Sequence, residues 1–400
     1  MADNVLLLGA GFSEAAGVPL MGQFVERMWE FAAGRVVPGN SFSPDDAKVF
    51  RNAMDVFAEL DGFHGRAEFD DRNIEDVLSI LSFNALSGVP GSTRNLTEIN
   101  RAIARTIELT CEVKHPGLPT EGKYSVVKDG PTEYRSFWRQ LFSCLSHGTG
   151  LPTIITTNYD LVLERSLFQA LISTFFHPAL NPLPFKQITL CYHNRNVDDV
   201  RYDVEYRRYT DWAAETPESV TGTVLKTSKT LSDENLDITI LKLHGSLNFP
   251  RKKPGATNDG EYFNPVALVD DPHILPPIFN KVTGRSVEGI WREALKALRS
   301  AKRVTVMGYS LPRTDIYMQY FLKAALGPNL DLDRISLLDP VLYEDSERAR
   351  DMEDRYCSCF SSQIQRRLFF RPSERDHYAD EGKLPHLLML LEHEPESILF

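Results

Sequence analysis

A series of short apolar runs, each followed at once by glycine or polar residues, constrains the fold most. Residues 5–8 run straight into Gly9, and similar runs occupy residues 153–156, 188–192, 238–243, 304–307 and 335–338. Short runs with such ends are typical of buried strands. Between some of these runs, apolar residues recur at helical spacing, as in residues 291–298 and 316–326. This spacing predicts helices. Strands that alternate with helices form parallel sheets, so we predict an α/β fold with a Rossmann-like parallel sheet.

More than a hundred residues without a strong strand signal separate the first two predicted strands. They include the helical patterns NIEDVLSILSFNAL and TEINRAIARTIELTCEV. We therefore predict an α/β domain from residues 1–34 and 150–345, an inserted helical subdomain from residues 35–149 and a C-terminal helical tail from residues 346–400. A second insertion, residues 195–235, interleaves Arg and Tyr in a way that could stack nucleotides. Its interspersed acidic residues favour a solvated loop or hairpin.

Composition and charge exclude several classes of protein. The 44 basic and 55 acidic residues give a net charge of -11, so we expect no direct nucleic-acid binding. The apolar runs are far shorter than the roughly 20 residues of a membrane-spanning helix, and the first residues lack a basic signal-peptide region. We therefore expect a cytoplasmic protein without a membrane contact. The five cysteines form no C-x-x-C pair, so neither a zinc site nor a disulfide framework is predicted.

A glycine-rich turn follows the first predicted strand. Gly9, Ala10, Gly11 and Ser13 stand where this strand passes into a helix. Glycines there let the backbone approach a pyrophosphate, and a helix N-terminus offers N–H donors. The spacing to Gly17 departs from the G-x-G-x-x-G fingerprint, so a purely structural turn is an equal alternative.

Polar residues at later strand exits support a ligand site. Thr157, Asn158 and Asp160 follow the second predicted strand, and His244 follows the fourth. Parallel sheets present such residues to ligands at one edge, and histidine is the natural base at neutral pH. Each segment also has a structural alternative, namely an Asn/Asp helix cap, a structural histidine or an ordinary connection. The last two exits add the candidates Gly308, Tyr309, Ser310 and Asp339.

Four segments, taken in order, resemble the sirtuin family. GAGFSEAAGVP at residues 9–19 is similar to its NAD loop Gly-Ala-Gly-x-Ser-x-x-x-Gly-Ile-Pro, which adds Gly17 and Pro19 to the cofactor-binding candidates. TTNYD at residues 156–160 resembles Thr-Gln-Asn-Ile-Asp, the pair His244-Gly245 resembles the catalytic His-Gly, and GYSL at residues 308–311 resembles the ribose loop Gly-Thr-Ser-Leu. The stretches ILPPIFNK and GYSLPRTDIY are similar to the bacterial sirtuin-like defence branch. The resemblance implies a sheet of the sirtuin type with NAD at this edge.

Departures from the family bear on the reaction. Protein-deacylating sirtuins carry paired C-x-x-C motifs for zinc after the catalytic histidine, and this chain has none there. Leu20-Met21-Gly22 replaces the Asp-Phe-Arg that follows the loop proline, and Thr157 replaces a glutamine. The resemblance therefore implies an NAD hydrolase without zinc that acts in antiphage defence by NAD depletion. An NAD-dependent protein deacylase or ADP-ribosyltransferase, and a non-catalytic sensor of an NAD-derived nucleotide, are the alternatives.

The chemistry of this cleavage predicts a role for each candidate. The nicotinamide–ribose bond breaks through an oxocarbenium-like state, so water must be oriented and activated. We expect Asn158 to position the water and His244 to act as general base. Ser13 and the Gly9 to Gly11 backbone would hold the phosphates, and Asp160 would orient its neighbours or bind ribose.

An NAD hydrolase must be restrained until it is triggered, so the helical insertion and the tail are the expected places of control. The leucines of LPHLLMLLEHEPESILF predict a homo-oligomer, with docking on the chain's own helices as an equal alternative. Family analogy alone adds a companion ATPase or a phage-derived trigger to the candidate partners.

Overall fold

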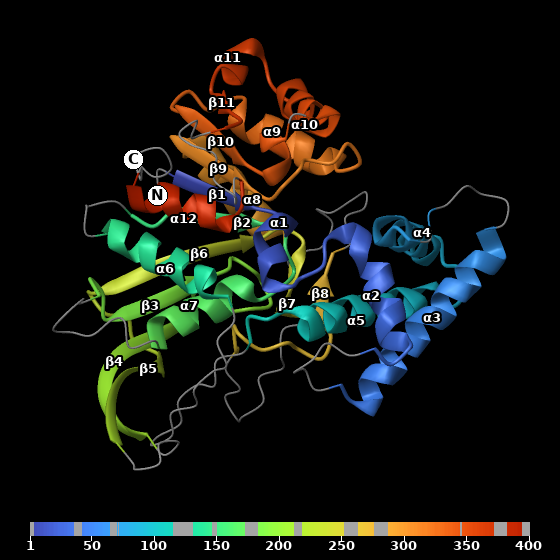
Figure 1. Cartoon of the computed structure of the whole chain (residues 1–400), viewed down its shortest axis with the longest axis horizontal. Helices are drawn as coiled ribbons and strands as arrows, with labels where there is room; N and C mark the ends of the chain where they lie inside the picture. Colours follow the sequence, from blue (N-terminus) through green and yellow to red (C-terminus); the bar gives the residue numbers. More distant parts are fainter. Residues whose placement is uncertain are drawn as a thin grey trace.

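The computed structural model describes residues 4–35, 42–64, 70, 72–114, 131–145, 150–172, 183–211, 218–251, 263–275, 287–344, 346–371 and 382–393. Its centre is a nine-stranded sheet (Figure 1). The strands lie in the order β11 (Leu368–Phe369), β10 (Arg334–Leu338), β9 (Arg303–Met307), β1 (Asn4–Leu8), β2 (Thr153–Thr156), β6 (Asn235–Lys242), β3 (Gln187–Cys191), β4 (Val200–Asp211) and β5 (Glu218–Ser228). A separate antiparallel pair consists of β7 (Gly245–Pro250) and β8 (Pro272–Ile274).

The sheet is parallel from β11 to β3, which confirms the predicted α/β class. Strand β1 is completely buried because parallel strands are covered by helices on both faces. Among the described strands of this sheet, β4 pairs antiparallel with β3 and with β5, and β4 and β5 form a long curved hairpin at one edge of the sheet (Figure 1). For residues 195–235 we expect a solvated loop or a hairpin from the sequence, and the structure forms a hairpin there.

The register of the central strands brings their carboxyl ends level with one another. Leu8 pairs with Thr156 on one side and with Met307 on the other. Thr156 pairs with Lys242, and Met307 pairs with Leu338. The residues that follow these five strands therefore emerge side by side at one edge of the sheet.

Helices cover the sheet in two groups. One group contains α6 (Thr132–Leu145), α7 (Val162–Ile172) and α12 (Leu384–His393), in which α6 contacts both of the others. The other contains α8 (Glu288–Ser300), which contacts α9 (Ile316–Leu326) and β6. The chain then continues through α10 (Glu347–Ser358) and α11 (Ser362–Gln365) to β11. No helix in the described ranges combines the length and the apolar character needed to cross a bilayer.

The leucines of the tail are part of this core. Leu384, Leu387, Leu390 and Leu391 on α12 are buried, and α12 packs against α6. The expectation that these leucines form an exposed contact surface is therefore wrong for the described residues, and the alternative of docking within the chain applies. Residues 394–400, which complete the predicted patch, lie outside the described ranges.

A helical bundle stands beside the sheet, shown in blue to teal in Figure 1. It consists of α2 (Phe24–Ala32), α3 (Pro44–His64), α4 (Ile74–Leu86) and α5 (Ser92–Thr110). Between residues 35 and 149 the described ranges hold helices and no strand. Within that span α6 packs on α7 beside the sheet, whereas α3 and α4 pack on α5, and α3 and α5 contact α2. The domain boundaries drawn from the sequence stay a prediction.

Candidate functional site

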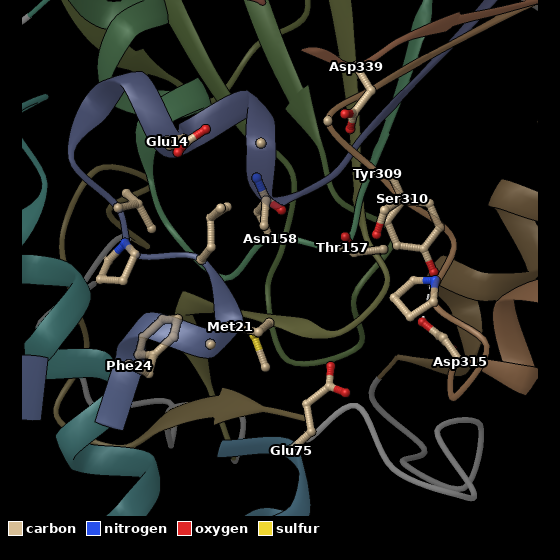
Figure 2. A pocket seen from close by; sticks show the side chains of 18 of the residues that line it. Glu14, Met21, Phe24, Glu75, Thr157, Asn158, Tyr309, Ser310, Asp315 and Asp339 are labelled. Atoms are coloured by element: carbon tan, nitrogen blue, oxygen red, sulfur yellow. Dashed lines mark hydrogen bonds between the residues drawn. The ribbon is translucent and has the colours of Figure 1, made fainter. Parts of the chain in front are cut away.

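A cavity of about 760 Å³ lies at the carboxyl edge of the parallel strands. Its walls come from the segments that follow β1, β2, β6, β9 and β10, together with the residues that precede and begin α4 (Figure 2). Strand β1 lies between β2 and β9, so the order of the strands along the chain changes direction at β1. Ligands of open α/β sheets bind at such a change of direction, and the volume lies within the range of small-molecule sites.

Most of the candidates from the sequence meet in this cavity. Its lining includes Ala10, Gly11, Pro19, Thr157, Asn158, Asp160, His244, Gly308, Tyr309, Ser310 and Asp339. Gly9, Ser13 and Gly17 are not among the described residues that line it. Gly17 instead lies against the carbonyl of Thr110, where an added Cβ would come within 2.6 Å of the oxygen.

The glycine-rich turn packs directly on the turn after β9. A Cβ on Gly9 would lie 2.4 Å from the carbonyl oxygen of Gly308, and a Cβ on Gly308 would lie 2.4 Å from the nitrogen of Phe12. Three amides of the turn, those of Gly9, Gly11 and Phe12, donate to the carbonyls of Met307, Gly308 and Gly9. The glycines thus join two strand exits, and a pyrophosphate here would have to use the other donors of the turn.

Asn158 is held in one orientation. Its Nδ2 donates to the carbonyl of Gly9 at 2.9 Å and to Ser13 Oγ at 3.0 Å, and its backbone N–H donates to Thr156 Oγ1 at 3.1 Å. Since a carbonyl only accepts, the amide nitrogen must face Gly9, which directs Oδ1 away from α1 (Ala10–Ser13) (Figure 2). The side-chain oxygen of Asn158 is therefore an acceptor presented to the cavity.

Ser13 lies behind Asn158 rather than on the cavity wall. Its side chain is buried, and its hydroxyl accepts the hydrogen bond from Asn158. This contact suits a residue that positions Asn158. Ser13 is not among the described residues that line the cavity, so the phosphate contact expected for it stays a prediction.

A buried ion pair connects the Asn158 segment to the end of β6. Lys242 Nζ lies 3.0 Å from Glu164 Oε1 and 2.9 Å from Ser246 Oγ, and it also donates to the carbonyl of Asp160. Burial raises the pKa of Glu164, and the charge of Lys242 opposes that shift. Asp160 Oδ1 accepts from Val162 N–H at 3.0 Å, so the carboxylate caps α7 while it lines the cavity.

His244 follows β6 by two residues and is almost completely buried at the cavity wall. Its ring neighbours those of Tyr159 and Trp291, with centroid distances of 6.4 and 6.3 Å. The carbonyl of Leu243 accepts from Trp291 Nε1 at 2.9 Å, and the carbonyl of His244 accepts from the amide of Leu275 at 2.8 Å. These bonds fix the backbone on which the imidazole is carried.

The wall formed by the exits of β9 and β10 is polar. Tyr309 donates from its hydroxyl to Asp315 Oδ2 at 2.8 Å (Figure 2). Burial and the charge of Asp315 raise the pKa of Tyr309 well above its ordinary value. Asp339 Oδ1 accepts from Val341 N–H at 3.0 Å. Burial also raises the pKa of Asp339, a shift that Glu14 increases and Arg348 opposes.

Sequence reasoning missed the residues that reach the cavity from elsewhere in the chain. The helical bundle and the segment before α4 contribute Phe24, Asp70, Arg72, Asn73, Glu75 and Ile107, and later segments contribute Asp315, Arg348 and Lys383. No local pattern shows that α4 begins at the cavity. The only signal is a helix start, since Asn73 Oδ1 caps α4 by accepting from Glu75 N–H at 3.0 Å.

Metal ligation has no support in the described ranges, which gather no three His, Cys, Asp or Glu side chains into a group that could hold an ion. The absence of zinc stays a prediction, because other parts of the chain also carry such residues.

No family model and no curated protein matches the sequence. Among solved structures, the chain is similar to a His-to-Asn mutant of a Sir2 homologue in complex with ADP-ribose, with 11% identity and a TM-score of 0.28 over 89% of this chain and 90% of that chain. It is also similar to a complex of a Sir2 homologue with NAD, with 12% identity and a TM-score of 0.28 over 89% of this chain and 88% of that chain. Likeness at this TM-score adds no argument about function.

Proposed function

We propose that this protein is an NAD hydrolase, which cleaves the nicotinamide–ribose bond of NAD+ to give nicotinamide and ADP-ribose. One observation carries the proposal. Asn158 and His244, delivered by two neighbouring parallel strands, line the same cavity as the exits of β1 and β9, and Asn158 turns its acceptor oxygen into that cavity.

In this proposal water is the nucleophile. Asn158 Oδ1 accepts a hydrogen bond from the water and so directs an oxygen lone pair toward C1 of the ribose. As the new C–O bond forms, the C–N bond breaks and its electron pair goes to the pyridinium nitrogen, which leaves as neutral nicotinamide. His244 takes the proton that the water loses and passes it to solvent.

The remaining candidates bind the dinucleotide. We assign Ala10 and Ser310, which line the cavity at the α1 turn and the β9 exit, to contacts with its phosphates and ribose, and Gly11 to the close approach of the backbone. Arg348 adds a positive charge to the same cavity. Asp339 is a further acceptor for ribose hydroxyls. We assign Ser13 to positioning Asn158, because the two side chains share a hydrogen bond of 3.0 Å.

The biological role rests on the sequence resemblance alone. It supports an effector of antiphage defence that depletes cytoplasmic NAD+, with a companion ATPase or a phage-derived trigger as the partner. A protein deacylase or ADP-ribosyltransferase would need a peptide bound next to the same cavity. A nucleotide sensor would bind NAD+ without consuming it.

The test is the release of nicotinamide from NAD+ by wild-type protein and two histidine variants. His244→Ala should lower the rate about a hundred- to ten-thousand-fold, the usual cost of losing a general base. His273→Ala is the matched control, because His273 lies on β8 and is not among the described residues that line the cavity. It should keep the wild-type rate. Equal turnover by His244→Ala would remove His244 from the mechanism.

A further inference from the structure

One end of the cavity holds two carboxylates that the proposed mechanism does not use. Glu75 from α4 and Asp315 from the start of α9 both line it, together with Tyr159 and Tyr309. Figure 2 shows the two carboxylates in the lower part of the view, away from Glu14 and Asp339. The sheet and the helical bundle therefore each contribute an acidic side chain to this end.

The two carboxylates differ in what they do within the protein. Asp315 uses both oxygens internally, because Oδ2 accepts from the Tyr309 hydroxyl at 2.8 Å and Oδ1 accepts from Met318 N–H at 3.2 Å. Asp315 thus holds Tyr309 and caps α9. Glu75 is half-buried in the first turn of α4, and its backbone is fixed by the Asn73 cap. Among the described bundle residues that line the cavity, Phe24, Glu75 and Ile107, Glu75 is the one with a charge.

The charge of Glu75 acts where the reaction would occur. Burial raises the pKa of Tyr159, and the charges of Glu75 and Asp315 raise it further. The same two charges contribute to the raised pKa of Tyr309. Tyr159 directly follows Asn158, and its ring neighbours that of His244. Glu75 therefore lies close enough to influence Tyr159, a residue that adjoins both proposed catalytic side chains.

Positive charge is what distinguishes the reacting end of NAD+. The pyridinium ring is cationic in the substrate, and the ribose becomes cationic as the bond breaks. A carboxylate in a partly buried cavity attracts such a charge more strongly than it would in water, and the faces of tyrosine rings favour cations as well.

We propose that Glu75 is a further catalytic and specificity-determining residue, whose carboxylate binds the pyridinium end of NAD+ and stabilises the cationic ribose. This rests on the proposed function. It predicts a preference for NAD+ over NADH, since the dihydropyridine ring of NADH is neutral. It also makes the active site composite, because the sheet provides Asn158 and His244 while the helical bundle provides the countercharge.

The experiment compares Glu75→Gln with Asp76→Asn. Both replacements remove one charge from the first turn of α4, but Asp76 is not among the described residues that line the cavity. Glu75→Gln should lower the kcat of nicotinamide release about tenfold or more, as loss of electrostatic stabilisation does. Asp76→Asn should leave kcat unchanged, and Glu75→Asp, which keeps the charge, should retain more activity than Glu75→Gln.

A binding measurement separates this inference from the proposed function. The affinities for NAD+ and NADH are measured by calorimetry in the His244→Ala background, with and without Glu75→Gln. The ratio of the two affinities should fall about tenfold in the double variant. If wild-type protein binds NAD+ without releasing nicotinamide, the proposed hydrolase fails while the ratio still tests Glu75. An unchanged ratio, or equal effects of Glu75→Gln and Asp76→Asn, would overturn the role of Glu75.

Discussion

At the scale of single residues, the chemistry depends on how Asn158 is held. Its amide nitrogen donates to Gly9 O and to Ser13 Oγ, and an exchange of the oxygen and nitrogen positions would lose the bond to Gly9 O, because a carbonyl only accepts. A fixed acceptor orients a water molecule at no cost in side-chain entropy during the reaction. In the proposed mechanism Ser13 therefore acts through Asn158.

Replacement of Asn158 tests this arrangement. Asn158→Ala should lower the rate of nicotinamide release by about a hundredfold or more, because the water loses its orientation. Ser13→Ala removes one of the two acceptors and leaves Gly9 O, so its effect on kcat should be much smaller. Steady-state kinetics of the two variants give the comparison. Full activity of Asn158→Ala, or a larger loss in Ser13→Ala, would contradict the arrangement.

Single residues also show which parts of the candidate site could be predicted from the sequence. The place of Asn158, His244 and Ser310 on the cavity wall could be predicted because each lies within three residues of the end of an apolar run, and strand ends of a parallel sheet meet at one edge. Glu75 could not be predicted, since its place depends on how a separate helical bundle packs against the sheet. Ser13 shows the remaining difficulty, because a motif does not tell a ligand contact from a support.

At the scale of elements, the central strands were the most predictable part. Residues 153–156 and 304–307 form strands where they were expected, and residues 335–338 make up most of β10. Because these strands are buried on both faces, their residues form uninterrupted apolar runs, and such runs can be recognised in the sequence. The two-residue strand β11 carries no comparable pattern, and it forms only because β10 lies beside it.

The wall of the cavity depends on the contact between the turns that follow β1 and β9. Gly9→Ala would bring a Cβ within 2.4 Å of Gly308 O and 2.6 Å of Tyr309 Cβ. Overpacking of this kind should lower the free energy of unfolding by about 1–3 kcal/mol. Gly150→Ala is the control, because nothing lies within 4 Å of its added Cβ. Urea unfolding of both variants is the measurement, and equal stability would show that the turns can separate without cost.

At the scale of the whole molecule, the helical bundle and the sheet close one cavity together. Arg165 on α7 donates to both carboxylate oxygens of Glu108 on α5, at 3.0 and 2.8 Å, and the amide of Glu112 donates to the carbonyl of Ala16 at 2.7 Å. These contacts join the bundle to the sheet next to the α1 turn. A movement of the bundle would therefore change the cavity, so we expect restraint of the proposed activity to act through the bundle.

Assembly is the second property of the whole molecule, and it remains a proposal. Since the described leucines of α12 are buried, the contact between copies is better sought on the bundle, where Phe83 and Leu86 of α4 are 55% and 83% exposed. We expect a homo-oligomer at micromolar concentration that Phe83→Ser with Leu86→Ser weakens. Light scattering of both proteins is the check. A monomeric wild-type protein would rule out the assembly, and an unchanged oligomer would move the contact elsewhere.

The central claim is that the cavity hydrolyses NAD+, and a single-turnover reaction with protein in excess tests it most directly. Chromatography should find nicotinamide and free ADP-ribose in equal amounts, with no ADP-ribose attached to the protein. Nicotinamide with protein-bound ADP-ribose would indicate a transferase. Bound and unconsumed NAD+ under these conditions would contradict the claim and indicate a sensor.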